Sequence, residues 1–599
     1  MGAKIRSILE KSYFPIVAAV IGVALLLPSL DEGLFWDDFY QKAVFTGQKT
    51  VIAAEKKVAS FSDMCTFSSG KPEEVKAGKD MGAFFPWWTN DGLKMNFWRP
   101  VTELTMILDY ELWPEKPWMM HLQSLLWFFL ILIVAGILYK RINGNGWVAG
   151  FAILLFALDS SHGVPVSWIA NRNSVLATFF GFCTILSHDY RYKNNWKPGI
   201  IIAPTLLGFS LLSTELGVST CAFLFSYIVF IEENSFKEKI ISLLPYALVV
   251  VLWRTFYNLF DYGVVGSGFY IDPLSSPFTF IKAVFQRWPL LFLAQFFGPS
   301  SSMFVFFSES VARGIIIFGC FFIPFFFYLI YPVLKTDRKA RFWILGFVLS
   351  TLPLCASDPH DRLLIIASLG GFGIISLFFK YKIEQPELFS KIFGLKVISW
   401  VFIVFFILIH IVLSPLQKLK TTEANKFTES IIDAQVNNKH LTVKKHNQIL
   451  TVINPAGSYI ALTHIIQQKL LKKEFNTKYF RGLAMSSSDL TIKRTDDRTL
   501  EIFAEKGFFP SKGIHTLYRD SPMKIGQEVT LTGLTVKILS LTKNSIPQNV
   551  KFTFEKPLED SDYRFVCWKN MGYEPYKLPG IGETDFLPKF NMADLFKKI

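Results

Sequence analysis

A series of apolar stretches, each long enough or nearly long enough to cross a lipid bilayer, dominates this sequence. A helix needs about 20 apolar residues to span the hydrocarbon core. The composition agrees with membrane insertion, because 51% of the residues are hydrophobic and only 18% are charged, against about 25% charged in soluble domains. We therefore expect an α-helical polytopic membrane protein with about eleven transmembrane helices, at residues 13–30, 121–139, 147–160, 168–188, 198–213, 216–231, 239–257, 311–333, 342–357, 362–379 and 396–414.

Two of the apolar stretches allow a second interpretation. The first follows basic residues such as Lys4 and Lys11, as in a signal peptide, but Asp31 stands where small residues would be needed for cleavage. A retained first transmembrane helix is therefore expected. The stretch 279–298 is apolar but carries Pro289 and a charged arginine. We expect a re-entrant or interfacial segment there.

Lysines and arginines mark alternate turns between the expected spans. They lie at 140–141, 191–197, 237–239, 335–341 and 380–391, and the intervening short turns are nearly free of them. Cytoplasmic loops of membrane proteins carry such an excess of positive charge. The pattern places the N-terminus in the cytoplasm and the C-terminus outside. It also accounts for much of the formal net charge of +14, and without a zinc-finger or RNA-recognition motif we expect no nucleic-acid partner.

Hydropathy divides the chain into two regions. Residues 1–414 are expected to form the transmembrane domain, with two long outer loops at 31–120 and 258–310. Residues 415–599 are more polar and lie after the last span. We expect them to form an extracytoplasmic α/β domain that is mostly β.

The polar C-terminal region mixes two periodicities. A helical pattern covers 458–473, whereas alternating runs such as 529–541 and 550–554 are typical of strands. Cys65 and Cys567 are the only cysteines in hydrophilic regions. A disulfide between them stays open, because the sequence cannot give the distance that such a bond requires.

Ionisable side chains collect at the outer ends of the expected spans. Such groups are costly at membrane depth and usually line a pathway or a site, although each alone could cap a helix or form an ion pair between helices. A carboxylate can act as general base on an acceptor hydroxyl, and arginines can hold a phosphate and stabilise its developing charge. The members of the set are Asp37, Asp38, Arg99, Arg172, Glu215, Arg254, His360 and Arg362. The set suits transfer from a phosphate leaving group, and because no metal-ligand spacing accompanies it we expect no metal or cofactor.

Several short segments stand in the order found in a known superfamily. They are Leu34-Phe35-Trp36-Asp37-Asp38, Phe97-Trp98-Arg99-Pro100-Val101, Leu108-Asp109-Tyr110, Trp118-Met119-Met120-His121-Leu122, His162-Gly163-Val164-Pro165-Val166, 168–177, 211–217 and Asp361-Arg362-Leu363-Leu364. Over roughly residues 10–415 the chain resembles the GT-C glycosyltransferases. The resemblance is greatest to protein O-mannosyltransferases, their relatives with tetratricopeptide regions, and bacterial lipid A aminoarabinose transferases.

The resemblance implies a multi-span GT-C fold with its active site on the non-cytoplasmic face of a bacterial inner membrane. It implies inverting transfer of a sugar from a polyprenyl-phosphate donor to a protein, lipid or glycan acceptor. By the same resemblance, Asp37 matches the acidic residue expected to act as base, with Asp38 in support. Arg99, Arg172 and Arg362 match expected donor contacts.

Three further residues, Glu215, Arg254 and His360, are expected members of the same site. The sequence also departs from the family pattern. Thr214 stands where a lysine is common, and aliphatic residues follow Arg362 where aromatic residues are usual. These departures leave a specialised or inactive member open.

Two other functions remain open from the sequence. A lipid or sugar transporter or flippase would also need many spans, but such folds often carry internal repeats and polar residues near the midplane, and neither is evident. A membrane-anchored binding protein would need only one or two spans rather than about eleven.

Overall fold

The computed structural model describes residues 3–46, 64–82, 84–298, 300–390, 394–442, 448–455, 479–509, 516–570 and 572–590, with isolated positions between 462 and 468. Helices account for 61% of the structure. The chain forms two compact units. The first contains Met1–Phe35, Phe97–Tyr262 and Asp272–Lys426, and the second contains Trp36–Asn96, Gly263–Ile271 and Phe427–Ile599. The polar C-terminal region therefore shares a unit with parts of both long loops.

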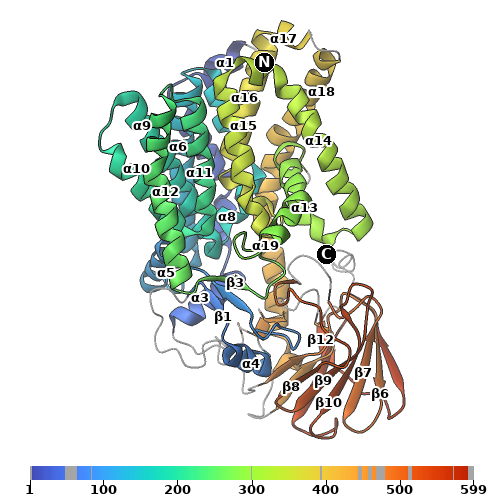
Figure 1. Ribbon diagram of the computed structural model, residues 1–599. Coiled ribbons are helices and arrows are strands. Elements are labelled where there is room, and N and C mark those ends of the chain that lie inside the picture. Colours follow the sequence, from blue (N-terminus) through green and yellow to red (C-terminus); the bar gives the residue numbers. More distant parts are fainter. Residues whose placement is uncertain are drawn as a thin grey trace. The chain divides into compact units, whose positions relative to one another are not determined.

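The first unit is built of helices (Figure 1). Its α-helices are α1 (Ala3–Leu9), α2 (Phe14–Ala24), α5 (Pro100–Leu112), α6 (Pro117–Asn143), α7 (Trp147–Leu158), α8 (Gly163–Ser167), α9 (Arg172–Asn194), α10 (Gly199–Ser213), α11 (Ser219–Phe230), α12 (Phe236–Leu259), α13 (Pro277–Phe296), α14 (Glu309–Thr336), α15 (Arg338–Thr351), α16 (Ser368–Glu384), α17 (Glu387–Ser390), α18 (Leu395–Ile407) and the first part of α19 (Ser414–Val436). Short 3-10 turns lie between them at η1 (Leu27–Asp31), η2 (Ser160–His162), η3 (Ile169–Asn171), η4 (Glu215–Val218), η5 (Ser301–Phe306), η6 (Pro353–Ala356) and η7 (Asp361–Ile365), and Leu408–Leu413 is a π-helix (η8).

Small residues let these helices pack closely around a core rich in phenylalanine. A Cβ atom at Gly373 of α16 would lie 2.3 Å from the ring of Trp343 on α15. Phe296 and Phe326 stack with ring centroids 4.2 Å apart. Because lipid supplies no hydrophobic drive between helices, such close approach and dispersion contact hold a membrane bundle together.

Six helical segments of the described residues are long and apolar enough to cross a membrane. They are Phe14–Asp31, Pro117–Asn143, Phe236–Leu259, Glu309–Thr336, Arg338–Ala356 and Leu395–Glu423, and one bent pair could add a seventh. The structure therefore supports fewer spans than the eleven expected. α10 and α11 have only 15 and 12 residues, and α9 carries polar side chains such as Arg172 and Asp189, which are buried among neighbouring helices.

The span expected at 147–160 is a broken helix. α7 ends at Leu158, and the segment that follows it is bent by 49°. The Asp159 side chain accepts a hydrogen bond from the Ser161 amide at 3.3 Å and caps the new turn. Asp and Ser side chains favour such caps over continued helix, so this local sequence explains the break.

The stretch expected to be re-entrant or interfacial is one continuous helix, α13. Pro289 lies inside it without ending it. Gly319 of α14 leaves room for the proline, because a Cβ atom there would lie 2.8 Å from Pro289 Cβ. A re-entrant turn within this stretch is therefore excluded, and α13 is not among the six segments that meet the criteria for a span.

In its described residues, the second unit combines short helices with three β-sheets. Its helices include α3 (Asp37–Phe45) and α4 (Pro72–Met81), and its strands are β1 (Thr66–Ser69), β2 (Lys94–Asn96), β3 (Gly263–Val265), β4 (Ile449–Val452), β5 (Phe480–Gly482), β6 (Leu490–Arg494), β7 (Thr499–Ala504), β8 (Glu528–Leu531), β9 (Leu534–Leu541), β10 (Pro547–Phe554), β11 (Tyr563–Lys569), β12 (Gly572–Pro575) and β13 (Thr584–Leu587). The strand orders are β1-β2-β3, β13-β6-β7-β10-β9-β8 and β12-β11-β4-β5.

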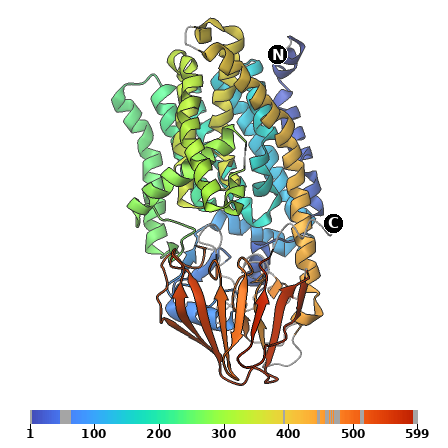
Figure 2. The same cartoon turned by 90° about the vertical axis from the view of Figure 1, so that its right-hand side faces the viewer.

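The six-stranded sheet is antiparallel (Figure 2), and it buries one face. Ile492, Ile502 and Val550 point inward and are fully buried, whereas the residues that alternate with them are more exposed and, apart from Phe503, polar. Trp87 packs against this inner side, with its ring 5.9 Å from that of Phe552. The alternation expected for strands is thus present.

Three details of this region differ from the sequence expectations or lie outside the structure. The run 529–541 is a hairpin of β8 and β9 that turns at Gly533, whose φ is +73°. Cys567 is a free thiol, so the disulfide with Cys65 is not formed. The helix expected at 458–473 lies outside the described residues, apart from isolated positions.

Candidate functional site

Arg99 and Glu215 form an ion pair in the first unit, although 116 residues separate them in the chain. Arg99 donates from Nε and Nη2 to Glu215 Oε2, at 3.1 and 2.7 Å. The two side chains are 17% and 31% exposed, so solvent reaches both. Two residues that the sequence assigned to one site therefore lie in direct contact.

Tyr257 and Thr214 hold Glu215 from other sides. The Tyr257 hydroxyl donates to Oε1 at 3.1 Å, and the Thr214 hydroxyl donates to Oε2 at 3.1 Å. Tyr257 is buried. The carboxylate orientation is thus fixed by three neighbours, and Thr214, which departs from the family pattern, belongs to this network.

Arg254 extends the network along α12. Its Cζ lies 5.5 Å from the centroid of the Tyr257 ring, and its Nη2 donates to Asp272 at 2.6 Å. Burial raises the pKa of Asp272, but the hydrogen bonds from Arg254 and from the Leu274 amide outweigh it and leave the pKa below its usual value. Asp272 is therefore ionised at neutral pH, whereas the buried Arg254 Nε has no hydrogen-bond partner among the described residues. We call Arg99, Glu215, Arg254, Tyr257 and Asp272 the arginine cluster.

Local sequence places four of the five members of the arginine cluster. Pro100 is a favourable first residue for α5, so Arg99 lies just before the helix begins. Glu215 opens the turn η4 that follows the end of α10. Arg254 and Tyr257 are three residues apart on α12 and therefore share a face.

The donors of the arginine cluster have the chemistry that suits an oxyanion. Each guanidinium offers several N–H donors in a planar arrangement that matches phosphate or carboxylate. Two arginines and two carboxylates make the cluster nearly neutral, so an incoming phosphate would compete with Glu215 and Asp272 for the same donors.

Arg172 lies elsewhere, in a fully buried ion pair. Its Nη1 is 2.5 Å from Asp109 Oδ2, and it also donates to Ser124 Oγ and to the Met120 carbonyl at 3.0 and 2.6 Å. Burial raises the pKa of Asp109, while the Arg172 charge opposes that rise. The arrangement clamps α5, α6 and α9 together, and its donors are largely used within the protein.

His360 and Arg362 lie around the turn η7. His360 Nδ1 accepts the Arg362 amide hydrogen at 3.3 Å, and the Arg362 guanidinium lies 5.2 Å from the centroid of the Trp168 ring. Burial, with the Arg362 charge, lowers the pKa of His360 to about 3. His360 is therefore neutral near pH 7, which suits it to hydrogen bonding rather than to holding a phosphate by charge.

Asp37 and Asp38 open α3 in the second unit. Asp38 is buried and Asp37 is half-buried. The residue before them, Trp36, has φ +50° and ψ −116°, a conformation that costs about 1–3 kcal/mol for a residue other than glycine. Trp36 occupies the N-cap position of α3, and its own side chain makes no capping hydrogen bond. Strain of this kind often accompanies functional residues.

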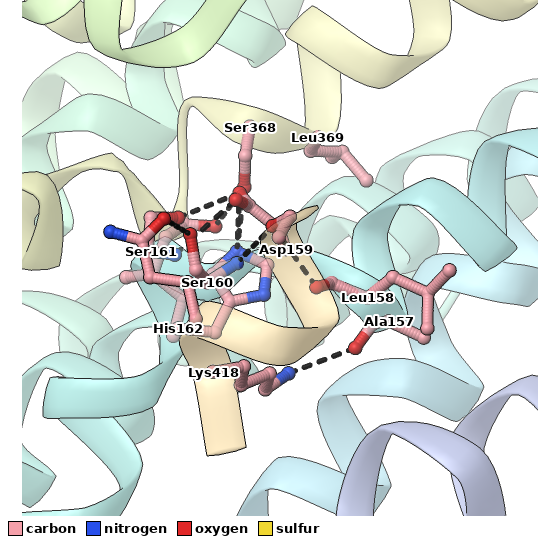
Figure 3. Close-up of polar contacts among 12 residues, drawn as sticks. Ala157, Leu158, Asp159, Ser160, Ser161, His162, Ser368, Leu369 and Lys418 are labelled. Atoms are coloured by element: carbon pink, nitrogen blue, oxygen red, sulfur yellow. Dashed lines mark hydrogen bonds and ion pairs between the residues drawn. The ribbon is translucent and has the colours of Figure 1, made fainter. Parts of the chain in front are cut away.

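Sequence reasoning missed a polar cluster at the break between α7 and α8 (Figure 3). Lys418 of α19 is fully buried, and its Nζ donates to the Ala157 carbonyl at 2.8 Å. Ser414 donates to the Leu158 carbonyl at 3.2 Å and accepts from the Ser160 amide at 2.8 Å. These side chains replace helical hydrogen bonds that the break removes. The available sequence signal was a serine at the end of the apolar stretch 396–414 with a lysine, Lys418, four residues later.

The same break carries a histidine and a carboxylate. His162 Nε2 lies 2.9 Å from Ser368 Oγ and 3.6 Å from Asp159 Oδ2. Asp159 Oδ2 also accepts the Ser161 hydroxyl at 2.6 Å. We call Asp159, His162, Ser368, Ser414 and Lys418 the helix-break cluster.

A second buried network was also missed by the sequence reasoning. His188 Nδ1 lies 2.8 Å from the Tyr246 hydroxyl, and its Nε2 lies 2.9 Å from Glu232 Oε1. The next residue, Asp189, accepts the Tyr227 hydroxyl at 2.7 Å. Every group named here has a partner, so the network is a polar core that ties α9, α11 and α12 together.

The described residues contain no group of three or more His, Cys, Asp or Glu side chains that could hold a metal ion. Comparison with protein-family models gives no match, and neither does comparison with curated proteins.

Proposed function

We propose that this protein is a membrane glycosyltransferase of the GT-C type. It would transfer a sugar, with inversion, from a polyprenyl-phosphate donor to a protein, lipid or glycan acceptor. The observation that carries the proposal is the arginine cluster, in which Arg99, Glu215 and Arg254 come together from three distant segments. The ordered motifs of the sequence and the apolar helices of the first unit support the same function.

The reaction needs two kinds of group. The acceptor oxygen attacks the anomeric carbon, the bond from that carbon to the phosphate oxygen breaks, and polyprenyl phosphate leaves with its additional charge. Arg99 and Arg254 would hold this phosphate and stabilise the charge. Asp37 would take the proton of the acceptor hydroxyl, a role assigned by the sequence resemblance, with Asp38 in support.

The proposal includes an orientation. Following the lysine and arginine pattern, the N-terminus and residue Arg338 would face the cytoplasm of a bacterial inner membrane, and the second unit would lie outside. This orientation requires an odd number of spans, and therefore at least one crossing beyond the six segments named above. A cysteine placed at exposed Lys506 should react with an impermeant thiol reagent in intact cells, and one at Arg338 should not. The opposite labelling pattern would contradict the orientation and place Asp37 on the wrong side.

The experiment that tests the function compares surface glycans and glycoproteins, by mass spectrometry, in cells with and without this protein. We expect at least one sugar addition to disappear with the protein. Identical glycan profiles under conditions where the protein is expressed and folded would contradict the proposal.

One observation favours a second candidate, a lipid or sugar transporter or flippase. The helix-break cluster places buried Asp159 and Lys418 at a discontinuous helix, and transporters often build their substrate sites at such breaks. Reconstitution into proteoliposomes with a fluorescent polyprenyl-phosphate sugar distinguishes the two. Movement of the probe between leaflets without sugar transfer would favour the transporter.

A further inference from the structure

The outward face of the six-stranded sheet in the second unit carries two exposed phenylalanines in one cross-strand row. Phe586 of β13 pairs with Thr491 of β6, and Thr491 pairs with Phe503 of β7. Directly paired residues project from the same side of a sheet, so both rings lie on one face. They are 59% and 39% exposed.

The spacing of the two rings follows from the sheet geometry. β6 separates their strands, and neighbouring strands lie about 4.8 Å apart, so the two side chains leave the sheet about 10 Å from each other. Only Thr491 stands between them in this row. The result is a platform with an aromatic ring at each end and a hydroxyl in the middle.

Hydrogen-bonding groups continue the row beyond Phe503. Asn549 of β10 is its next partner, and the Asn549 amide donates to Glu501 Oε1 at 2.6 Å. In the adjacent row, Glu501 stands between Lys493 and Lys551. Lys537 and Glu528 follow Lys551 in the same row, so this row mixes both signs and does not present a patch of one sign to a polyanion or a polycation.

Edge-to-edge pairing with a second copy does not explain the exposed rings well. β13 is an edge strand of only four residues, and Pro588 follows it directly. Short edge strands and prolines discourage pairing with another chain. The two rings also project from the face of the sheet rather than from its edge.

We propose that this face, formed by Phe503, Thr491, Phe586 and Asn549, binds a neutral oligosaccharide. The apolar faces of two sugar rings would stack on the two phenylalanines, whose face carries a partial negative charge that attracts C–H groups. Thr491, Asn549 and Glu501 would exchange hydrogen bonds with sugar hydroxyls. The platform carries no concentrated charge of one sign, and its polar groups suit an uncharged polyol. This binding does not require sugar transfer, and with the orientation proposed above it would hold a glycan of the cell surface near the protein.

The test uses the full-length protein in lipid nanodiscs and an immobilised panel of neutral tetrasaccharides of glucose, mannose, galactose and N-acetylglucosamine. No lipid donor is present, so the result is separate from that of any transfer assay. We expect wild-type protein to bind at least one member. The double variant Phe503→Ala/Phe586→Ala should bind it about tenfold more weakly or not at all.

The matched control is Ile525→Ala/Ile581→Ala, which removes two side chains of the same unit that are 65% and 62% exposed but lie outside the row. It should bind like wild type. Thr491→Arg, a surface change that fills the space between the rings, should block binding without removing either ring. Phe503→Tyr/Phe586→Tyr should retain binding.

Three results would overturn the proposal. They are failure of wild-type protein to bind any member of the panel, equal binding by the phenylalanine double variant and its control, and conversion of a dimer to a monomer by the phenylalanine substitutions. The last result would identify the face as a contact between two copies of the chain.

Discussion

The charged side chains of the first unit differ in how much of their bonding capacity the protein uses. Arg172 is fully buried, and its guanidinium pairs with Asp109 and donates hydrogen bonds to Ser124 and Met120. Arg99 and Arg254 are partly exposed. A partly exposed arginine can exchange its carboxylate partner for a ligand, so it suits a binding site. A fully buried arginine keeps its protein partners, so its role is structural. This difference directs attention to Arg99 and Arg254 among the arginines that the sequence pointed out.

If Arg99 can release Glu215 and bind a lipid phosphate instead, substitutions at either residue should change the affinity for that phosphate. The measurement is the affinity of the protein, in lipid nanodiscs, for polyprenyl phosphate. Arg99→Lys loses the planar set of donors and should weaken binding by about tenfold. Glu215→Gln removes the competing negative charge and should strengthen binding several-fold while sugar transfer falls.

Arg338→Lys is the matched control, because Arg338 is half exposed and pairs with Glu233 far from the cluster in sequence. It should bind like wild type. Unchanged affinity in both Arg99→Lys and Glu215→Gln would remove the cluster from phosphate binding.

Among the elements, the broken helix shows most clearly where sequence reasoning stops. The apolar run 147–160 predicts a helix, and the structure contains α7 there. The periodicity could not indicate that Lys418, more than 250 residues later, donates to the last turn of that helix. Likewise, chain spacing alone does not reveal that Arg99 meets Glu215. The cap of a helix depends on residues next to its end, so the sequence can indicate it. Contacts between distant segments depend on how whole helices pack, and the local sequence does not indicate them.

The helix-break cluster predicts a large loss of stability in Lys418→Met. The substitution keeps the apolar stem but leaves the buried Ala157 carbonyl without its donor, which costs about 1–3 kcal/mol. The measurement is the midpoint of thermal aggregation for the protein in detergent, which should fall by several degrees.

Lys420→Met controls for loss of a positive charge on the same helix, since Lys420 is exposed. It should leave the midpoint unchanged. Equal midpoints for Lys418→Met and Lys420→Met would show that the break does not depend on Lys418.

At the scale of the whole molecule, the sequence correctly indicated a mostly helical chain with a β-rich C-terminal region. It overestimated the number of spans, because hydropathy cannot separate a lipid-facing helix from a short helix buried among others, such as α11. Neither could it indicate that loop residues Trp36–Asn96 join the C-terminal residues in one unit. Contacts between distant segments decide unit boundaries, and a hydropathy profile contains no such contacts.

The most direct test of the proposed transferase measures how fast the protein-dependent surface glycan appears in cells that carry wild-type or Asp37→Asn protein. General-base assistance typically contributes about 10²–10⁴-fold to a rate. Asp37→Asn retains the size of the side chain and should therefore slow glycan appearance by about that factor while protein level and polyprenyl-phosphate affinity stay normal, and Asp38→Asn should be milder. Glycan appearance at the wild-type rate in folded Asp37→Asn protein would contradict the assignment of the base, and the absence of any protein-dependent glycan would contradict the transferase itself.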